Sequence, residues 1–324
     1  MSMTETDPPK TTRSSEVGEA LAKYRPDLLR HCYRMLGSFG DAEEVVQDVL
    51  LRAWRSRETY GGDAPVSHWL MRIATNACLN ALARGGALGL PQLERHPAEV
   101  GTAIEELEAA HWITPAPDAR LFPDPGQAAE TRESVAIAFI ALLQRLPPRQ
   151  RAVLLLKDVV GWSADEIASA LELTLPSVNS ALHRARETVA APPRGRIDDP
   201  PPDILRSYVR SWEERDLEGL VALLKKDVVF AMPPHATWFR GAEAVGRFLQ
   251  TPRFAAFWSR GLRAYATRAN GLPAVVWYTP GADGAYRPHS IHVMLFEDGE
   301  LAEATNFIGA HYLRGFELPD ELPR

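Results

Sequence analysis

Polar side chains that can hydrogen-bond to nucleic-acid bases gather on one face of a segment in the middle of the chain. At about 100° per residue, a helix that starts near Pro176 carries them on its outer face: Asn179, Ser180, His183 and Arg184, with Ser177 and Arg186 on the flanks. Asparagine can pair with an adenine edge, arginine with guanine or phosphate, and serine with a base or the backbone. This face suits a DNA major groove, but polar faces are also common on ordinary surface helices, so both interpretations remain open at this point.

Two short helices joined by a tight turn must position that face. Ser163 and Glu166 have the spacing of a capping box, which predicts the start of the first helix. The second helix has Pro176 in its first turn, where a missing N–H costs nothing. The apolar positions recur at helical spacing and form the buried side: Ile167, Ala168, Leu171, Val178, Ala181, Leu182 and Ala185. Residues 162–187 are therefore a predicted helix-turn-helix.

A cluster of acidic and amide side chains opens an earlier predicted helix. The cluster comprises Asp41, Glu43, Glu44, Gln47 and Asp48. We expect Asp41 to cap the helix with Glu44 as its capping partner, and an apolar stripe that includes Val49 and Trp54 to face the core. Acids in the first turns also stabilise the helix dipole, so helix stabilisation and partner binding both explain the pattern.

The third predicted helix, at 66–84, has aromatic and apolar groups on the wrong side for a solvated surface. Trp69, Arg72, Asn76 and Leu79 lie on or beside the face opposite the buried stripe. Aromatic platforms beside Arg and Asn suit unstacked bases, which need stacking as well as hydrogen bonds. The alternative is that another helix or a linker covers Trp69 and Leu79.

The totals describe a globular protein of about two domains. The chain has 324 residues, 45% of them hydrophobic, and a net charge of -6. Eight acids against two arginines fall in residues 85–130, and seven bases against six acids in 131–191, so the helix-turn-helix should bind DNA only weakly by itself. No apolar run could span a membrane, and the polar N-terminus lacks the core of a signal peptide, so we expect a cytoplasmic protein without membrane contact. Cys32 and Cys78 have no metal-like spacing and are expected to be free thiols.

The order of these motifs resembles bacterial RNA polymerase sigma factors of the extracytoplasmic-function type. The similarity rests on LLRHCYRMLGSFGDAEEVVQDVLLRAW (28–54), SHWLMRIATNACLNALAR (67–84) and LPPRQRAVLLLKDVVGWSADEIASALELTLPSVNSALHRAR (146–186). The resemblance implies mainly α sigma domains: region 2 at 16–85 and region 4 at 131–190, after a disordered N-terminus at 1–15. It implies core RNA polymerase and promoter DNA as partners.

The resemblance also assigns roles to the motifs. The acid cluster would dock on the clamp of the polymerase's largest subunit, and region 4 would bind the minus-thirty-five duplex and touch the flap of the second-largest subunit. The third helix would read the minus-ten element as single strands through Trp69, Arg72, Asn76, Leu79 and Asn80. Two family features are missing. Ala83, Arg84 and Gly85 stand where a basic pair is usual, and Ser177 to Ala181 replaces a Thr-Val-Lys-Ser-Arg pattern, which implies fewer phosphate contacts.

An acidic linker at 86–130 separates the two regions. It is either a plain tether or, as the resemblance implies, a strand that threads the polymerase's active cleft. We expect a short helix at 99–112, with Ile104, Leu107 and Trp112 as possible anchors.

Residues beyond a Pro-rich linker at 191–202 exceed what a small sigma factor needs. In 203–324, helices come first and strands follow, with a hairpin turn at Asp298-Gly299, which predicts an α+β cone with a curved antiparallel sheet. The segment is similar to SnoaL-like domains. A pocket there would be lined by Trp238, Trp277, Tyr278, His292 and Asn306, with Phe257 and Trp258 as further candidates and His235 and His289 as further titratable groups. Most of the aromatics are better explained as core than as ligand contacts, because large aromatic side chains dominate protein cores.

We therefore expect a sigma factor that binds core polymerase and directs promoter-specific initiation, without catalysis, cofactor or metal. The third domain is expected to regulate it by sensing a small molecule or by contacting the sigma domains. One alternative is a one-component helix-turn-helix regulator whose last domain senses a ligand; another is a SnoaL-like enzyme with a DNA-tethering module.

Overall fold

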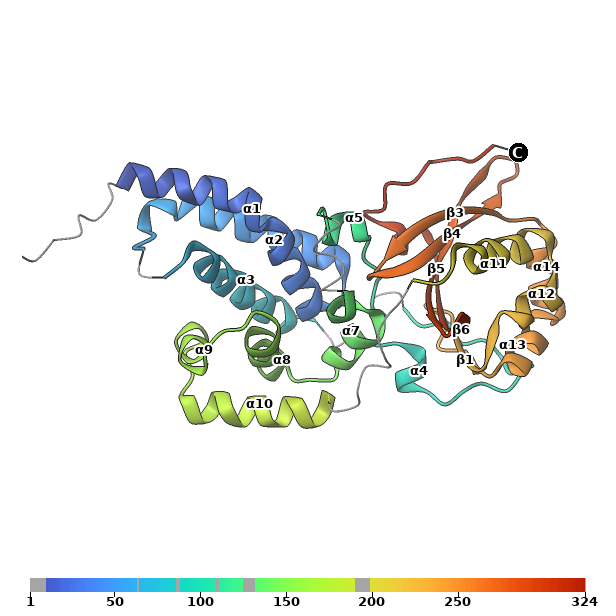
Figure 1. The fold of residues 1–324 in the computed structure, drawn as a ribbon, viewed down its shortest axis with the longest axis horizontal. Helices are drawn as coiled ribbons and strands as arrows, with labels where there is room; N and C mark the ends of the chain where they lie inside the picture. Colours follow the sequence, from blue (N-terminus) through green and yellow to red (C-terminus); the bar gives the residue numbers. More distant parts are fainter. Residues whose placement is uncertain are drawn as a thin grey trace, which may run out of the picture. The chain divides into compact units, whose positions relative to one another are not determined.

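The computed structural model describes residues 10–62, 64–85, 88–108, 111–124, 132–189 and 199–323. The chain divides into two compact units, each built from two separate stretches (Figure 1). One unit comprises Met1–Gly86 and Leu143–Ala191, and the other comprises Ala87–Leu142 and Pro192–Arg324. No helix in the described part of the chain is long and apolar enough to cross a membrane.

Three helices begin the first unit: α1 (Lys10–Leu36), α2 (Phe39–Arg55) and α3 (Val66–Leu82), with a short 3-10 turn at Arg57–Thr59. Their core is built from the predicted apolar stripes, with Leu29, Cys32, Val46 and Leu70 fully buried. Helix α1 begins at Lys10, earlier than the expected disordered 1–15 allowed, and continues through Pro26; residues 1–9 lie outside the described part.

The cap of α2 differs from the prediction. Ser38, not Asp41, is the N-cap residue, and its hydroxyl accepts a 3.3 Å hydrogen bond from the Asp41 backbone N–H. Because the helix starts at Phe39, which is buried, the chain enters it one turn earlier than the acidic pattern indicated. The acids therefore lie within the first three turns rather than at the cap itself.

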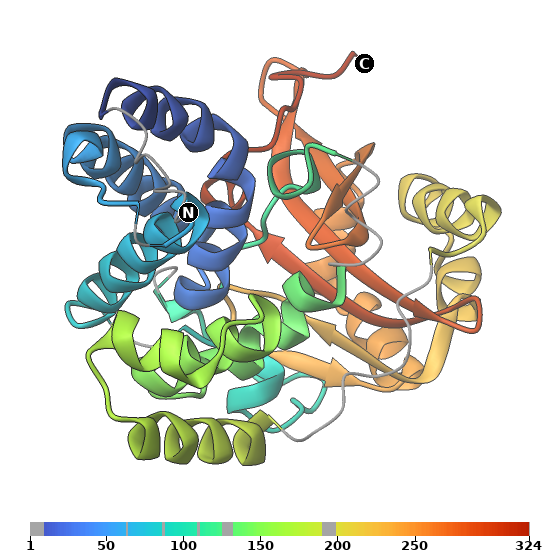
Figure 2. The ribbon, with the colours of Figure 1, turned by 60° about the vertical axis from the view of Figure 1, so that its left-hand side comes forward.

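The helix-turn-helix is present as predicted, in a group formed by α7 (Ile137–Gln144), α8 (Pro148–Leu154), α9 (Ala164–Leu171) and α10 (Leu175–Val189), with a π-helical stretch at Leu155–Val159. The capping box is formed in both directions: Ser163 N donates to Glu166 Oε2 at 2.7 Å, and Glu166 N to Ser163 Oγ at 3.2 Å. In the first unit α3 contacts α8 and α9, and Figure 2 shows these green helices beside the blue ones.

The second unit holds helices α11 (Pro202–Glu214), α12 (Leu217–Ala222), α13 (Ala242–Leu249) and α14 (Pro252–Trp258) and strands β1 (Leu224–Ala231), β2 (Trp238–Arg240), β3 (Arg263–Ala269), β4 (Leu272–Pro280), β5 (Tyr286–Glu297) and β6 (Glu300–Ile308). A 3-10 turn at Ala310–Leu313 follows β6. The predicted hairpin turn is confirmed, since Asp298 and Gly299 have φ of 53° and 84° between β5 and β6.

The sheet order is β2-β1-β6-β5-β4-β3. The antiparallel expectation was wrong at one pair, because β1 runs parallel to β6 while the other neighbours are antiparallel. Parallel neighbours need a long connection, and here nearly the whole domain lies between the two strands. Helices α11 to α14 cover one face of the curved sheet (Figure 1), and the main core lies between them, around Trp212, Phe248, Trp258, Trp277 and Met294.

The described part of the acidic linker belongs to the second unit and includes the single-turn helices α4 (Pro91–Glu94) and α5 (Asp118–Leu121); a 3-10 turn at Arg132–Val135 follows the linker. The expected helix at 99–112 is absent from the described part of that segment, where residues 103–108 are extended. The reason is that its backbone groups bond to the third domain: Ala236 N donates to Glu105 O at 2.9 Å, and Leu107 N to Pro234 O at 3.0 Å. Most of the Pro-rich segment 191–202 lies outside the described residues.

Candidate functional sites

The acid cluster lies along α2 on the surface of the first unit. Asp41, Glu44, Gln47 and Asp48 are exposed, and Glu43 is half-buried, 3.9 Å from Arg25. Beside the cluster, the side chain of Leu51 is 53% exposed and that of Trp54 49% exposed. The prediction that Trp54 belongs to the buried stripe of this helix was therefore wrong. An exposed apolar pair next to acids is typical of a protein-binding surface.

The face of α3 is partly covered by the loop that precedes it, and α3 also contacts α8 and α9. Arg72, Asn76 and Asn80 are exposed, whereas Trp69 and Leu79 are half-buried. Tyr60, in the loop before α3, packs against Trp69 with ring centroids 5.3 Å apart and the ring planes tilted by 43°. Tyr60 was not among the residues singled out from the sequence, although its place in a Gly-rich loop just before the helix was a usable signal.

A cavity of about 580 Å³ lies between this loop, α3 and α9 within the first unit. Tyr60, Trp69 and Arg72 line it on one side, and Trp162 and Glu166 line it on the other. His68 lines the cavity as well: its ring lies 4.8 Å from the Trp162 ring, and its Nδ1 lies 3.4 Å from Glu166 Oε1. The helix that carries the minus-ten candidates thus packs directly against the helix-turn-helix.

A second contact joins the same two parts of the unit through Arg151, which is 1% exposed. Its guanidinium donates to the backbone carbonyls of Met35, Gln144 and Leu146 and to the Gln144 side chain. Gln144 Nε2 also donates to Arg34 O at 3.2 Å. The end of α1 is therefore held by side chains from α7 and α8.

The six side chains proposed on α10 are all exposed: Ser177, Asn179, Ser180, His183, Arg184 and Arg186. Arg186 forms a two-pronged pair with Asp158, at 3.1 Å and 2.6 Å, and His183 lies 3.4 Å from Glu187. The Ser177 hydroxyl lies 2.8 Å from that of Thr174, which also accepts from Ser177 N and so caps the helix. Asn179, Ser180 and Arg184 are therefore the better-presented members of the face.

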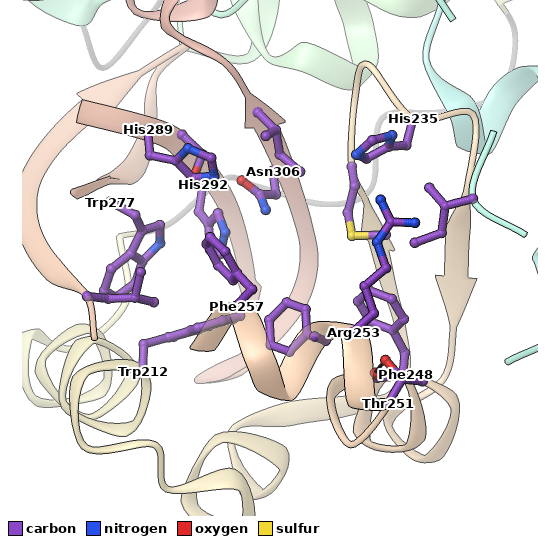
Figure 3. A pocket seen from close by; sticks show the side chains of 16 residues that line it. Trp212, His235, Phe248, Thr251, Arg253, Phe257, Trp277, His289, His292 and Asn306 are labelled. Carbon is purple, nitrogen blue, oxygen red and sulfur yellow. Dashed lines mark hydrogen bonds between the residues drawn. The ribbon is translucent and has the colours of Figure 1, made fainter. Parts of the chain in front are cut away.

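The third domain encloses a cavity of about 210 Å³ between the sheet and its covering helices (Figure 3). Three predicted residues line it: Trp277, His292 and Asn306. Trp238 and Tyr278 do not. Trp238 pairs with Ala231 and packs with Val229 on the other side of the sheet, and the Tyr278 hydroxyl donates to Pro319 O at 2.8 Å.

Strand alternation explains that error, because successive side chains point to opposite faces. Phe239, next to Trp238, faces the main core and stacks on Phe248 with centroids 4.5 Å apart. Trp277, next to Tyr278, also faces the main core, where its ring lies beside that of His292. Of the further candidates, Phe257 lines the cavity, whereas Trp258 belongs to the core.

Three histidines line the cavity, and burial favours the neutral form of each. Burial and nearby His289 lower the pKa of His292 to about 3, and its Nδ1 lies 2.7 Å from the Tyr208 hydroxyl. Burial also lowers the pKa of His289 and His235. No Asp or Glu is among the described residues that line the cavity, and no cluster of three or more metal-ligating side chains occurs in the described ranges.

This lining is poorly suited to acid–base catalysis. A general base works best with a pKa near the working pH, and that of His292 lies far below it. The cavity is better suited to binding than to proton transfer.

The acidic linker is fixed to the third domain by its predicted anchor Trp112, which is 1% exposed and donates from Nε1 to Pro234 O at 2.9 Å. Further bonds lie on both sides of it: Ala98 N to Trp238 O at 2.8 Å, Trp238 Nε1 to Arg95 O at 3.0 Å, and Gln92 Nε2 to Glu303 Oε1 at 3.0 Å. Ile104, another predicted anchor, lines the cavity. The described part of the linker thus packs as part of this unit and is not a plain tether.

Asn270, which was not singled out from the sequence, fastens the distal part of the linker. It is fully buried at φ 57° between β3 and β4. Its Oδ1 accepts from Ala116 N at 2.9 Å, and its Nδ2 donates to Val135 O at 2.7 Å. An Asn-Gly pair between two strands is typical of a tight turn and carries no local sign of these long-range bonds.

Comparisons with known proteins agree with this architecture. Family models match Sigma-70 region 2 at residues 21–87, Sigma-70 region 4 at 136–189 and a SnoaL-like domain at 205–304. The chain is 37% identical over 325 residues to the ECF RNA polymerase sigma factor SigG of Mycobacterium tuberculosis, an alignment that covers 97% of this chain and 87% of that protein.

A second relative from Mycobacterium tuberculosis, the ECF RNA polymerase sigma factor SigJ, is 29% identical over 234 residues, 69% of each chain. The crystal structure of SigJ from the same organism has a similar fold. It superposes with a TM-score of 0.60 at 24% identity and covers 94% of this chain and 100% of that one.

Proposed function

The chain belongs to the extracytoplasmic-function (ECF) RNA polymerase sigma factors, and from this membership we infer how its parts divide the work. As a sigma factor it binds core RNA polymerase and directs promoter-specific initiation of transcription. Its third domain has the SnoaL-like fold. Separate surfaces bind the polymerase, read the promoter and regulate both activities.

The α2 surface docks on the clamp of the polymerase's largest subunit. Four exposed polar side chains, Asp41, Glu44, Gln47 and Asp48, supply charge complementarity, and exposed Leu51 and Trp54 supply apolar area. Charged rims accelerate encounter, while buried aromatic anchors carry most of the affinity. The flap of the second-largest subunit receives the helix-turn-helix domain.

Two surfaces read the promoter. The α3 face, with Arg72, Asn76 and Asn80 exposed and the Trp69–Tyr60 pair beside them, takes the unstacked bases of the minus-ten strand. The α10 face reads the minus-thirty-five duplex, chiefly through Asn179 and Arg184.

In the arrangement seen here, the α3 face and the α10 face cannot bind the minus-ten and minus-thirty-five elements at the same time. The elements are about 25 base pairs apart, which is roughly 85 Å of duplex at about 3.4 Å per base pair. A unit of this size has a radius of gyration of about 14 Å. The contacts of His68 with Trp162 and of Arg151 with Met35 therefore belong to a closed form, which must open on the polymerase.

The third domain regulates the sigma factor by holding the linker and does no chemistry. The observation that supports this most strongly is the set of hydrogen bonds that join the described part of the acidic linker to the third domain, with Trp112 as the anchor. An extended acidic segment that is bonded to the third domain is not available to the polymerase's cleft. The docked form is thus the less active one.

Reconstituted transcription tests both levels of the proposal. Core polymerase with the full chain should initiate at specific promoters, and failure to do so at every genomic promoter would contradict the sigma function itself. A truncation after residue 191 should initiate at the same promoters at a higher level. Equal activity of the two proteins would remove the regulatory role and leave the sigma function standing.

A further inference from the structure

We propose that the cavity of the third domain binds a small, neutral aromatic molecule with a hydroxyl group, and that the bound molecule tightens the hold of the domain on the linker through Ile104. The regulatory consequence rests on the proposed function, whereas the binding and its coupling to the linker do not.

The size and lining of the cavity indicate an aromatic guest. Its volume is about 210 Å³, and its walls include Trp212, Phe248, Phe254 and Phe257. An apolar protein cavity of about 150 Å³ holds a benzene ring, so this one has room for two fused rings. Offset and edge-to-face contacts with aromatic walls favour such a guest over an aliphatic one of equal volume.

Unpaired polar atoms inside the cavity indicate a hydroxyl group. Trp277 is 2% exposed and Asn306 9% exposed, and within the described structure Trp277 Nε1 and Asn306 Oδ1 have no hydrogen-bond partner. His235 Nδ1, also unpaired there, lies on the opposite wall of the cavity (Figure 3). A buried donor and a buried acceptor each cost about 1 to 3 kcal/mol when unsatisfied. A hydroxyl can accept from the indole N–H or donate to the amide oxygen, and either bond satisfies one of these atoms.

The guest should carry no charge at its buried end. The deeper polar groups are neutral imidazoles, an amide and the Ser290 hydroxyl, and a buried charge without a partner is strongly unfavourable. Arg253 lines the cavity as well, but it is exposed and so belongs to the mouth. If an anionic group replaced the hydroxyl, the free-energy cost of its desolvation would exceed the favourable interaction with the distant Arg253.

Ile104 connects the cavity to the linker. Its side chain packs against the domain core and lines the cavity, while the next residues, Glu105 and Leu107, bond to the backbone of Ala236 and Pro234. A guest that fits the existing space gains contact with Ile104 only while the linker is docked. By linkage, guest binding must then stabilise the docked linker by the same factor by which docking improves guest affinity.

The experiment uses the full chain with 2-naphthol as the probe, and naphthalene and 2-naphthoate as comparison compounds. Isothermal titration should show saturable binding of 2-naphthol, about fivefold weaker binding of naphthalene, which lacks one hydrogen-bonding group, and weaker binding still of 2-naphthoate. Hydrogen exchange of residues 103–108 should slow when 2-naphthol is present. Absence of saturable binding up to about 1 mM, where the binding free energy is only about 4 kcal/mol, overturns the proposal.

Two linker variants isolate the coupling. Ile104→Ala should weaken 2-naphthol binding five- to tenfold and abolish its effect on exchange at 103–108. Val100→Ala is the matched control, because Val100 also packs on the core from the linker but does not line the cavity, and its affinity should be unchanged. Equal effects of the two variants overturn the role of Ile104.

Should Ile104→Ala disturb the linker fold, Ile308→Phe offers a second route, since Ile308 lines the cavity from β6 and a larger side chain there fills it. It should abolish binding while leaving exchange at 103–108 in the free protein unchanged; retained 2-naphthol affinity contradicts the assigned site. If binding and slowed exchange are both observed but transcription does not respond to 2-naphthol, the inference stands and the proposed regulatory function fails.

Discussion

Replacing Trp112 with alanine should release the linker from the third domain and raise promoter-specific transcription. Trp112 is 1% exposed, and its Nε1 donates to Pro234 O at 2.9 Å. Its position between Leu107 and Ala116, which both bond to the domain, makes it the central anchor of the docked segment. The released linker then becomes available to the polymerase.

The size of the effect follows from burial. Trp-to-Ala substitutions at buried positions cost about 3 to 5 kcal/mol. If that loss falls on docking alone, the undocked fraction rises roughly 150- to 5,000-fold. Trp112→Phe keeps most of the buried ring and loses one hydrogen bond, worth about 1 kcal/mol. Because Pro234 O still accepts from Leu107 N, the phenylalanine variant should raise the undocked fraction only about fivefold.

Hydrogen exchange and single-round transcription measure the two halves of this prediction on the same proteins. Exchange at 104–108 and 112–116 should accelerate in the order wild type, Trp112→Phe, Trp112→Ala, and transcription should rise in the same order. Leu93→Ala is the control, because Leu93 also lies in the linker but is 41% exposed. It should change neither readout.

Two results would refute the reasoning at different steps. If exchange stays slow in Trp112→Ala, the tryptophan is not the anchor. If exchange accelerates but transcription does not change or falls, linker docking does not restrain the sigma factor. Circular dichroism of the variants separates both results from unfolding of the third domain.

Three further outcomes are expected. Asp48→Arg should weaken binding to core polymerase about tenfold in a titration, with little effect on folding because Asp48 is exposed. Glu19→Arg, which changes an exposed acid on α1, should leave this affinity unchanged. Equal losses of affinity in the two variants would argue against the clamp assignment. Arg151→Leu should lower the free energy of unfolding in urea by about 3 to 5 kcal/mol, because it leaves buried acceptors unpaired. The control Arg149→Leu, at an exposed position, should lower it by less than about 0.5 kcal/mol. Similar values for the two variants would contradict this explanation. Burial lowers the pKa of His292 in the folded protein to about 3, so the unfolded chain takes up the proton first as the pH falls below 6.5. Between pH 7 and pH 5, the free energy of unfolding of the wild type should therefore fall by about 2 kcal/mol more than that of His292→Gln. Parallel pH profiles of the two proteins would refute this.

Much of the fold was predictable because its signals are local. The capping pair Ser163 and Glu166, the turn at Asp298-Gly299 and the apolar stripes depend on residues a few positions apart. The structure confirms them, except that Trp54 of the α2 stripe is exposed. Short-range hydrogen bonds and helical periodicity act within one or two turns, so the sequence carries them directly. The exposed faces of α3 and α10 follow from the same periodicity.

The errors arose where a partner distant in the chain decides the outcome. The pleat of β2 and the bulge between Trp277 and Tyr278 in β4 set which of two adjacent aromatics enters the cavity, and the parallel pairing of β1 with β6 joins strands far apart in sequence. A one-residue change of phase reverses every side chain of a strand, and no local pattern records it.

By itself, the sequence determined the order of the motifs, the two helices expected to bind the promoter, the weakly basic charge of the helix-turn-helix region and the family that the chain resembles. Only the tertiary structure decided where the linker goes. An acidic, Pro- and Gly-rich segment has little intrinsic preference for any one conformation, and its backbone groups take whichever partners lie nearby. Here Pro234, Ala236 and Asn270 supply those partners, which turns an apparent tether into a wall of the cavity.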